Sequence, residues 1–337
     1  MLKRFLLWLT IISALLMGLS VYWVYRPLPL TTNTVDLSIE PNTSVKGIAK
    51  AAVQAGVGVD ADLLFLFFRL SGQSRALRAG SYEINSGETA LDVLRKLTRG
   101  EESLRAVSLI DGWTFKQFRA ALNKAEGLKH DSRELSEEAI MEKLGLAGTP
   151  AEGRFFPDTY TYGKGSSDLR VLQRAANAMT KQLGAAWSRR APDIQVKTID
   201  EALILASIVE KETGRESDRT TISSVFHNRL RIGMPLQTDP TVIYGMGDSF
   251  DGNLRRADLR TDHPWNTYTR KGLPLTPIAM PGKNALLAAV QPAQSQALYF
   301  VARGDGTSQF SATLDEHNAA VNRYQRGLKP ATAEEAK

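Results

Sequence analysis

The segment Ile204–Gly214, ILASIVEKETG, places two glutamates, Glu210 and Glu212, at the end of an otherwise apolar run. A carboxyl group in apolar surroundings can donate and accept protons in catalysis. The run has helical spacing, and at about 100° per residue positions i and i+2 point to nearly opposite sides of a helix. The two acids therefore cannot form a paired-carboxylate site with each other.

A helical wheel separates the expected roles of the two acids. Glu212 lies roughly 50° from the mean direction of the apolar residues, whereas Glu210 lies roughly 110° from it. Glu212 is therefore expected to face apolar surface, where desolvation raises the pKa of a carboxyl group, as a general acid near neutral pH requires. The structural alternative is a solvated helix end in which a glutamate pairs with Arg215 or Arg219.

Polar and aromatic residues gather in two segments further along the chain, 228–247 and 262–274. Amides, short hydroxyl groups and aromatic faces are typical of a sugar site, because they hydrogen bond to hydroxyl and N-acetyl groups and stack on the ring. The same residues are also ordinary turn formers, so each of them alone has a structural interpretation. The predicted substrate-binding residues are Gln237, Thr238, Asp239, Tyr244, Asn266 and Tyr268.

The composition excludes several functional classes. The chain has 337 residues, 43% of them hydrophobic, which suffices for a sizeable core in roughly two domains. It has no cysteine, so disulfides, thiolate catalysis and Cys-ligated zinc are excluded. Its four histidines lack the spacing of metal ligands, and no metal or cofactor is expected. The formal net charge of +6 is too small to indicate nucleic-acid binding.

An apolar segment near the N-terminus, residues 5–25, contains no charged residue. As a helix rising about 1.5 Å per residue it spans roughly 30 Å, the thickness of a hydrocarbon core. Basic residues precede it and aromatic residues gather at its far end. The positive-inside rule therefore keeps residues 1–4 in the cytoplasm and places everything after the segment outside. The alternative is a cleaved signal peptide, whose apolar region would be shorter and end in small residues.

The rest of the chain divides into a linker, a small module and a larger domain. Residues 26–35 form a Pro/Thr linker. Residues 36–105 contain two similar strand–turn–helix units, typical of a small α+β module; its alternative role is a spacer or dimerisation element. Residues 106–330 form the larger domain, in which a hairpin over 298–312 precedes a last helix. Residues 331–337 are expected to be a disordered tail.

Within the larger domain, apolar spacing predicts helices over 115–128, 135–144 and 167–187. The segment 151–165 indicates a loop-rich turn, and the composition after Asp239 is also loop-heavy. The expected fold class is α+β, with an N-terminal transmembrane helix, a small α+β module and a larger mixed α/β domain.

Several long motifs occur in order along the chain: ASIVEKE, NRL-x-x-GMPLQTDPT-x-x-Y, NTY, GLP-x-x-PI-x-x-PG and YFVA…FS-x-TL-x-EHN. Together they resemble the membrane-anchored endolytic murein transglycosylases, the MltG (YceG-like) family, over essentially the whole chain. The resemblance implies that the small module is a LysM-like peptidoglycan-binding fold and the larger domain a YceG-like catalytic domain. The chain departs from frequent family patterns at Leu275 (GLPP), Met280 (NPG) and Ser308 (GTH).

The resemblance implies cleavage of the β-1,4 bond between N-acetylmuramic acid and N-acetylglucosamine, leaving a 1,6-anhydromuramic end without adding water. It identifies Glu212 as the catalytic acid, in agreement with the helical wheel, and makes Glu210 and Ser207 supporting residues. A muramidase that uses Asp239 or Glu152 as a second carboxylate is one alternative. A membrane-tethered, non-catalytic peptidoglycan-binding scaffold is another.

The same resemblance implies the cellular setting. The expected location is the bacterial inner membrane, crossed once, with a cytoplasmic N-terminus and a periplasmic catalytic domain. The expected partners are peptidoglycan glycan strands and the membrane, together with the peptidoglycan synthases, near which the enzyme would terminate nascent strands. No nucleic-acid partner and no cofactor are expected.

Overall fold

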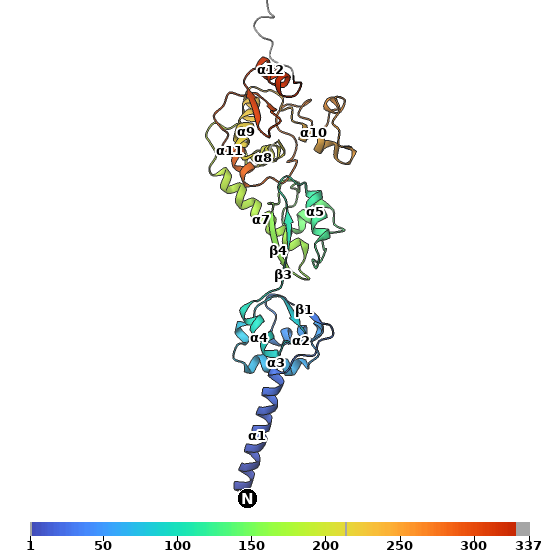
Figure 1. Cartoon of the computed structure of the whole chain (residues 1–337), viewed down its shortest axis with the longest axis vertical. Coiled ribbons are helices and arrows are strands. Elements are labelled where there is room, and N and C mark those ends of the chain that lie inside the picture. The colour runs from blue at the N-terminus through green and yellow to red at the C-terminus, as the bar shows by residue number, and fades with distance from the viewer. Residues whose placement is uncertain (1, 213, 328–337) are drawn as a thin grey trace, which may run out of the picture. The chain divides into compact units, whose positions relative to one another are not determined.

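The chain begins with a long apolar helix whose side chains are exposed. The structure is a computed structural model that describes residues 2–212 and 214–327. Helix α1 (Leu2–Tyr25) contains the predicted apolar segment, and the part Lys3–Tyr25, with a mean hydropathy of 2.1, is long and apolar enough to cross a membrane. Figure 1 shows α1 leaving the first compact unit of the chain. The predicted tail over 331–337 lies outside the described residues.

The first compact unit contains the two predicted strand–turn–helix repeats. Its elements are β1 (Thr34–Ile39), α2 (Val45–Ala55), α3 (Ala61–Leu70), the 3-10 helix η1 (Ser74–Ala76), β2 (Gly80–Asn85) and α4 (Ala90–Arg99). Strands β1 and β2 pair antiparallel, and alternate residues of β1 are buried, as a half-buried strand requires. Helix α3 is absent from the sequence-based prediction because ADLLFLFFRL is so rich in apolar residues that a helical period does not stand out.

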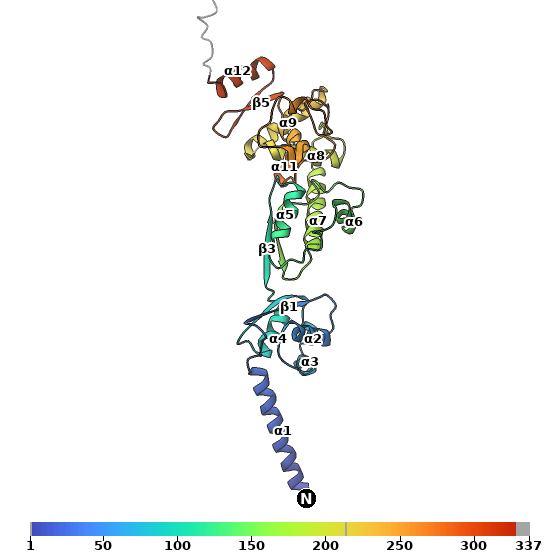
Figure 2. The ribbon, with the colours of Figure 1, turned by 90° about the vertical axis from the view of Figure 1, so that its right-hand side faces the viewer.

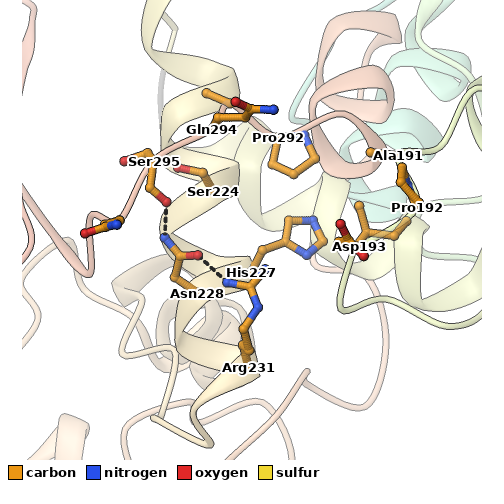
Figure 3. Close-up of a pocket in the computed structure, with 13 residues that line it drawn as sticks. Ala191, Pro192, Asp193, Ser224, His227, Asn228, Arg231, Pro292, Gln294 and Ser295 are labelled. Carbon is orange, nitrogen blue, oxygen red and sulfur yellow. Dashed lines mark hydrogen bonds between the residues drawn. The ribbon is translucent and has the colours of Figure 1, made fainter.

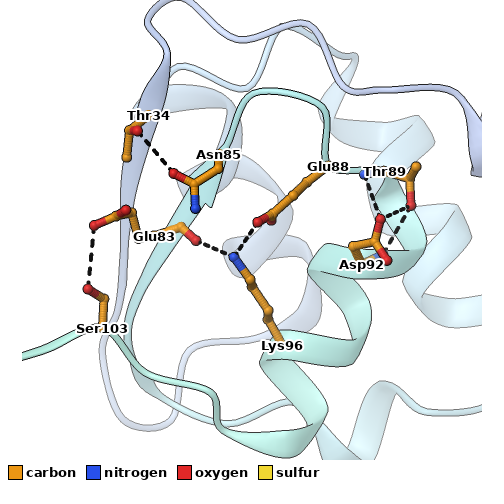
Figure 4. A network of polar contacts seen from close by, with 8 residues as sticks. All are labelled: Thr34, Glu83, Asn85, Glu88, Thr89, Asp92, Lys96 and Ser103. Carbon is orange, nitrogen blue, oxygen red and sulfur yellow. Dashed lines mark hydrogen bonds and ion pairs between the residues drawn. The ribbon is translucent and has the colours of Figure 1, made fainter.

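A polar network fixes the second repeat (Figure 4). Thr89 and Asp92 form a capping box at the start of α4, in which the Asp92 carboxylate accepts a hydrogen bond from the Thr89 backbone N–H at 3.0 Å. The Lys96 ammonium lies 2.5 Å from a carboxylate oxygen of Glu88 and donates to the Glu83 carbonyl at 2.7 Å. These contacts join α4 to β2 and to the turn between them.

Two segments from later in the chain, 125–129 and 161–167, belong to the same compact unit. The Ser81 hydroxyl of β2 donates to the carbonyl of Lys164 at 3.2 Å. The Lys164 ammonium also pairs with the carboxylate of Asp36 on β1. The unit is therefore completed by residues that the sequence assigned to the larger domain.

The strands β3 (Leu104–Leu109) and β4 (Asp158–Gly163) form a two-stranded sheet. Residues 151–165 were expected to be a loop-rich turn, and this expectation was wrong for the part that forms β4. The alternating threonines and tyrosines of DTYTYG are β-branched and aromatic residues, which favour a strand.

The second unit comprises 108–124, 130–160 and the chain from Asp168 onward. Its helices are α5 (Phe115–Lys124), α6 (Glu137–Lys143), α7 (Asp168–Trp187), α8 (Ile199–Glu212), α9 (Glu216–Arg231), α10 (Asp239–Met246), α11 (Lys283–Val290) and α12 (Leu314–Tyr324), with 3-10 turns η2 (Gly247–Ser249) and η3 (Asp258–Arg260). Helix α8 is central, because α7, α9, α10 and α11 all contact it. Figures 1 and 2 show these helices gathered around α8.

Helices α5, α6 and α7 confirm the predicted helices within a few residues. The expectation of loop from Asp239 onward was wrong for its first eight residues, which form α10. Pro240 sits in the first turn of α10, where a missing backbone N–H removes no helical hydrogen bond. The predicted hairpin is present as β5 (Tyr299–Ala302) and β6 (Ser308–Ser311), which pair antiparallel before α12.

Candidate active site

Helix α8 brings both glutamates to the centre of the second unit. Its first turn is capped by the Thr198 hydroxyl, which accepts a hydrogen bond from the Glu201 backbone N–H at 3.1 Å. The buried Ser207 hydroxyl donates to the Ile204 carbonyl at 2.7 Å and accepts from the Ile278 backbone N–H at 3.0 Å. Ser207 therefore ties α8 to the proline-rich segment over 273–282, which forms no helix, as the sequence predicted.

Glu212 lies at the last position of α8 and is mostly buried. Its pKa is raised from 4.5 to about 7, mainly by burial and to a lesser extent by the charge of Asp239. The Thr238 hydroxyl donates a hydrogen bond to Oε1 of Glu212, which together with the charge of Arg229 lowers the pKa. Among the described residues no cation forms an ion pair with Glu212. At neutral pH both protonation states of this carboxyl group are therefore accessible.

Two buried threonines, Thr241 and Thr267, hold the backbone of Thr238. The Thr238 backbone N–H donates to Oγ1 of Thr267 at 3.1 Å, and the Thr241 hydroxyl donates to the Thr238 carbonyl at 2.7 Å. The hydroxyl oxygens of Thr241 and Thr267 lie 2.9 Å apart. Since Thr241 already uses its proton, Thr267 is the donor between them. Sequence reasoning found Thr238 but missed Thr241 and Thr267, which carry no signal beyond their place in the TDPT and NTY motifs.

Arg229 is a buried cation whose charge lowers the pKa of Glu212, and sequence reasoning missed it. It is 7% exposed, and its Nε and Nη1 donate to the carbonyls of Leu298 and Leu236, both at 2.7 Å. Its guanidinium lies 5.4 Å from the ring centre of Tyr299. The signal was helical spacing: Arg229 follows the buried Phe226 by three residues, so it shares the buried face of α9.

Glu210 is as well buried as its neighbour but has different partners. Its carboxylate pairs with Arg219 at 3.1 Å, with side-chain exposures of 8% for Glu210 and 11% for Arg219. Its second oxygen accepts from the Gly282 backbone N–H at 2.8 Å. The two glutamates, which the helical wheel predicted to point in different directions, therefore have different partners. Glu210 pairs with a cation, and Glu212 accepts a hydrogen bond from a neutral hydroxyl group.

Asp239 and Tyr268 lie next to Glu212 and contact each other, because the Tyr268 hydroxyl donates to Oδ1 of Asp239 at 2.5 Å. Burial, followed by this hydrogen bond, raises the pKa of Tyr268 well above its usual value. The structure places Asn266 differently, with 0% exposure. Its amide nitrogen donates to the Thr261 carbonyl at 2.7 Å, and its oxygen accepts from the Tyr268 backbone N–H at 2.8 Å. Asn266 therefore holds the loop that carries Tyr268.

Comparison with known proteins identifies the family of this chain. The model of the YceG-like family matches residues 37–323. The chain belongs to the YceG-like family. An endolytic murein transglycosylase of Bacillus subtilis is 30% identical over 310 residues, which cover 86% of this chain and 85% of that protein.

Two further relatives are more distant. An endolytic murein transglycosylase of Streptococcus pneumoniae D39 is 27% identical and aligns with 87% of this chain, but this chain spans only 59% of that protein. The crystal structure of a yceG-like protein from Listeria monocytogenes shares 27% identity with a TM-score of 0.53, covering 86% of this chain and 99% of that one. The YceG-like architecture therefore extends over most of the chain.

In this YceG-like chain Gln237 has an unusual backbone. Its φ of 48° lies in the left-handed region, which residues other than glycine rarely occupy. Its backbone N–H donates to the Thr267 carbonyl at 3.0 Å, which holds this conformation, and its side chain is exposed. Such strain persists only where the surroundings enforce it and gathers at functional sites.

Tyr244 points to a second acid, Glu152, and not to Glu212. Burial, followed by the charge of Glu152, raises the pKa of the Tyr244 hydroxyl, and the Tyr244 ring packs edge-on against Trp265 with ring centres 5.6 Å apart. Glu152 is 7% exposed, accepts from the Phe115 backbone N–H at 3.1 Å and so caps α5. Burial raises the pKa of Glu152 to about 7. The structure therefore separates Tyr244 from the other predicted binding residues.

A cavity of about 420 Å³ in the second unit is bordered by Tyr268 and by Arg256 and Arg260. Another cavity, of about 600 Å³, lies around His227 and Arg231 at the C-terminal part of α9 (Figure 3). His227 accepts from the Gln195 backbone N–H at 3.0 Å and its other ring nitrogen lies 2.9 Å from the Ala289 carbonyl, so it is a structural residue.

No cluster of three or more acidic or histidine side chains that could hold a metal ion occurs within residues 2–212 and 214–327. The histidines are dispersed: His317, for example, stacks on Tyr299 with ring centres 5.1 Å apart.

Proposed function

We propose that this chain is an endolytic murein transglycosylase in which Glu212 is the single proton donor and acceptor. The observation that carries the proposal is the raised pKa of Glu212, caused by burial without an ion-pair partner among the described residues. A general acid needs to be protonated at the pH of the reaction and to have a pKa near it, and Glu212 meets both conditions. The names of the relatives supply the substrate, a murein glycan.

The proposed reaction uses one carboxyl group twice. Protonated Glu212 donates its proton to the glycosidic oxygen as the bond from that oxygen to C1 of N-acetylmuramic acid breaks. The C6 hydroxyl oxygen of the same sugar then bonds to C1 and gives its proton to the Glu212 carboxylate. The products are a free N-acetylglucosamine hydroxyl end and a 1,6-anhydromuramic end, and no water is consumed. A pKa near 7 suits both halves of this cycle.

The neighbouring residues have separate roles in the proposal. Thr238 orients the Glu212 carboxyl group, and Asp239, Tyr268 and the exposed Gln237 hold the glycan. Arg229 limits how far burial raises the pKa of Glu212. Asn266 acts through Tyr268, whose backbone N–H it accepts.

Further residues play supporting roles. Glu210 and Ser207 support helix α8. Tyr244 belongs to the cap of α5 and is not proposed to contact the sugar.

The proposal places the protein in the cell envelope. Helix α1 acts as a single-pass anchor in the bacterial inner membrane with residues 1–4 in the cytoplasm, because the part Lys3–Tyr25 is long and apolar enough to cross a membrane and most of its large apolar side chains are exposed. Residues 36–105 serve as a LysM-like peptidoglycan-binding module and residues 106–330 as the catalytic domain, both periplasmic. Nearby peptidoglycan synthases would supply the nascent strands.

Digestion of purified sacculi tests the proposal. The wild-type chain should release fragments whose ends have the mass of 1,6-anhydromuramic acid, and Glu212→Gln should release none while retaining its folded circular dichroism spectrum. The matched control is Glu216→Gln, an exposed glutamate four residues on. Reducing ends would instead indicate a muramidase, and Asp239→Asn would then identify its second carboxylate. Binding without turnover in both proteins would indicate a scaffold.

A further inference from the structure

Helix α3 exposes a row of leucines that the first unit does not bury. Leu63 is 42% exposed, Leu66 49% and Leu70 76%. At about 100° per residue these three side chains fall within roughly 60° of one another on the helix. The opposite side of the apolar face, with Leu64 at 1% and Phe68 at 0%, packs into the core. Only part of the apolar face of α3 is therefore buried in the core of the unit, and the rest is exposed.

The exposed leucines line a cavity beside α1. The rings of Trp23 on α1 and Phe67 on α3 contact each other edge to face, with centres 5.8 Å apart. A cavity of about 680 Å³ between the two helices is lined by residues of both, among them Leu16 and Leu19 of α1 and Leu66 of α3. Figures 1 and 2 show α3 on the side of the unit from which α1 emerges.

The α1 residues that line this cavity show which part of α1 lies beside α3. Leu16 precedes the end of α1 by nine residues, which at about 1.5 Å each corresponds to roughly 13 Å along the helix axis. If α1 crosses a membrane with its apolar part in the hydrocarbon, Leu16 and Leu19 lie inside it. The α3 leucines that line the same cavity then reach the hydrocarbon boundary.

We propose that α3 lies in the outer surface of the membrane that α1 crosses, with Leu63, Leu66 and Leu70 among the lipid acyl chains. The inference rests on the proposed membrane anchor. Lipid is the occupant because the leucine row is continuous with the lipid-facing surface of α1. Arg26 lines the same cavity, and Arg69 lies next to the three leucines in α3. In this arrangement both cations lie where the phosphate headgroups of the lipids would be. The unit is then held to the membrane by two helices instead of one.

Fluorescence quenching by lipid tests this contact. The chain has no cysteine, so single cysteines can be introduced and labelled with an environment-sensitive fluorophore. The test site is Leu66→Cys, and Ala14→Cys in α1 reports the anchor. Ser38→Cys is the control, because it is exposed on β1, which lies on the far side of the unit from α1 in both views. The full chain is reconstituted into phosphatidylethanolamine and phosphatidylglycerol vesicles with and without doxyl-labelled lipid.

The labels on Leu66→Cys and Ala14→Cys should both lose most of their fluorescence to doxyl lipid, whereas Ser38→Cys should lose little. Quenching of Ala14→Cys but not of Leu66→Cys would overturn the inference and leave the anchor intact. If that result came with disulfide crosslinking between two Leu66→Cys chains, a second copy would be the occupant and lipid would be rejected. If Ala14→Cys were unquenched, the anchor itself would fail, and the inference with it.

Discussion

The Thr238 hydroxyl donates a hydrogen bond to Oε1 of Glu212, and the Thr238 backbone is itself held by the buried hydroxyl groups of Thr241 and Thr267. A neutral donor stabilises the carboxylate less than a cation would. The pKa of Glu212 therefore stays near 7 in spite of the hydrogen bond. This relationship distinguishes Glu212 from Glu210, whose carboxylate pairs with the Arg219 guanidinium.

Thr238→Val should move the pH dependence of the reaction. The hydrogen bond favours the charged form of Glu212, so its removal should raise the pKa of Glu212 further. The alkaline limb of kcat/KM, where Glu212 loses its proton, should move up by about one to two pH units, since a hydrogen bond to a charged group contributes about 1.5–3 kcal/mol. Activity below the limb should fall about tenfold because the carboxyl group loses its orientation.

Thr238→Ser is the matched control. It keeps the hydroxyl group, so the alkaline limb of its kcat/KM profile should lie at the wild-type pH. A limb that stayed in place in Thr238→Val would show that this hydroxyl does not set the pKa of Glu212. The pH–rate profiles on isolated glycan strands give both answers.

Arg229→Gln should change both stability and the same pH limb. The Arg229 charge lowers the pKa of Glu212, so its loss should move the alkaline limb upward, as in Thr238→Val. It also removes charged donors from the buried carbonyls of Leu236 and Leu298, which should destabilise the fold by about 2–4 kcal/mol. Arg231→Gln, on the exposed side of α9, should stay within about 0.5 kcal/mol of the wild type. Urea unfolding measures the difference, and equal effects of the two changes would contradict the assigned role of Arg229.

The sequence predicted most elements because their signals are local. The helices α5, α6 and α7 and the β5–β6 hairpin all follow from residues close in sequence. The partners of the two acids do not, because Glu210–Arg219 and Glu212–Thr238 are contacts made by packing. A helical wheel gives the direction of a side chain on one helix but not what the next helix places there.

The predicted binding residues show the same limit. Asn266 and Tyr268 are two positions apart in the NTY motif, but one is buried as a loop support and the other borders a cavity. Tyr244 follows Asp239 by five residues on α10, which turns it roughly 140° away from that residue. Composition identified the segments that contain the predicted binding residues. Only the fold shows which of these residues border a cavity and which support a neighbouring loop or helix.

Glu212→Gln should stabilise the protein at alkaline pH. Folding raises the pKa of Glu212 from 4.5 to about 7, so the folded state holds the proton more tightly than the unfolded state. Between these values stability falls as pH rises, and above pH 7 the charged group destabilises the folded state by about 3 kcal/mol. Glutamine carries no charge, so the variant should be more stable than the wild type at pH 8 and similar to it at pH 4.

Urea unfolding of both proteins at the two pH values measures this effect. The inactive variant should have the higher unfolding midpoint at pH 8, a gain in stability at the expense of function. Equal stability of the two proteins at both pH values would mean that the pKa of Glu212 is not raised by the fold.

Glu210→Gln should have the opposite effect although it lies only two residues away. Its loss leaves the Arg219 guanidinium buried without its carboxylate, which should destabilise the fold by about 3–5 kcal/mol at neutral pH. The Gly282 backbone N–H can still donate to the glutamine oxygen, so the loss comes from the charge and not from the hydrogen bond. The double variant Glu210→Gln with Arg219→Gln removes both charges and should recover part of the stability. A Glu210→Gln protein as stable as Glu212→Gln at pH 8 would show that the two acids do not differ in the way that their partners indicate.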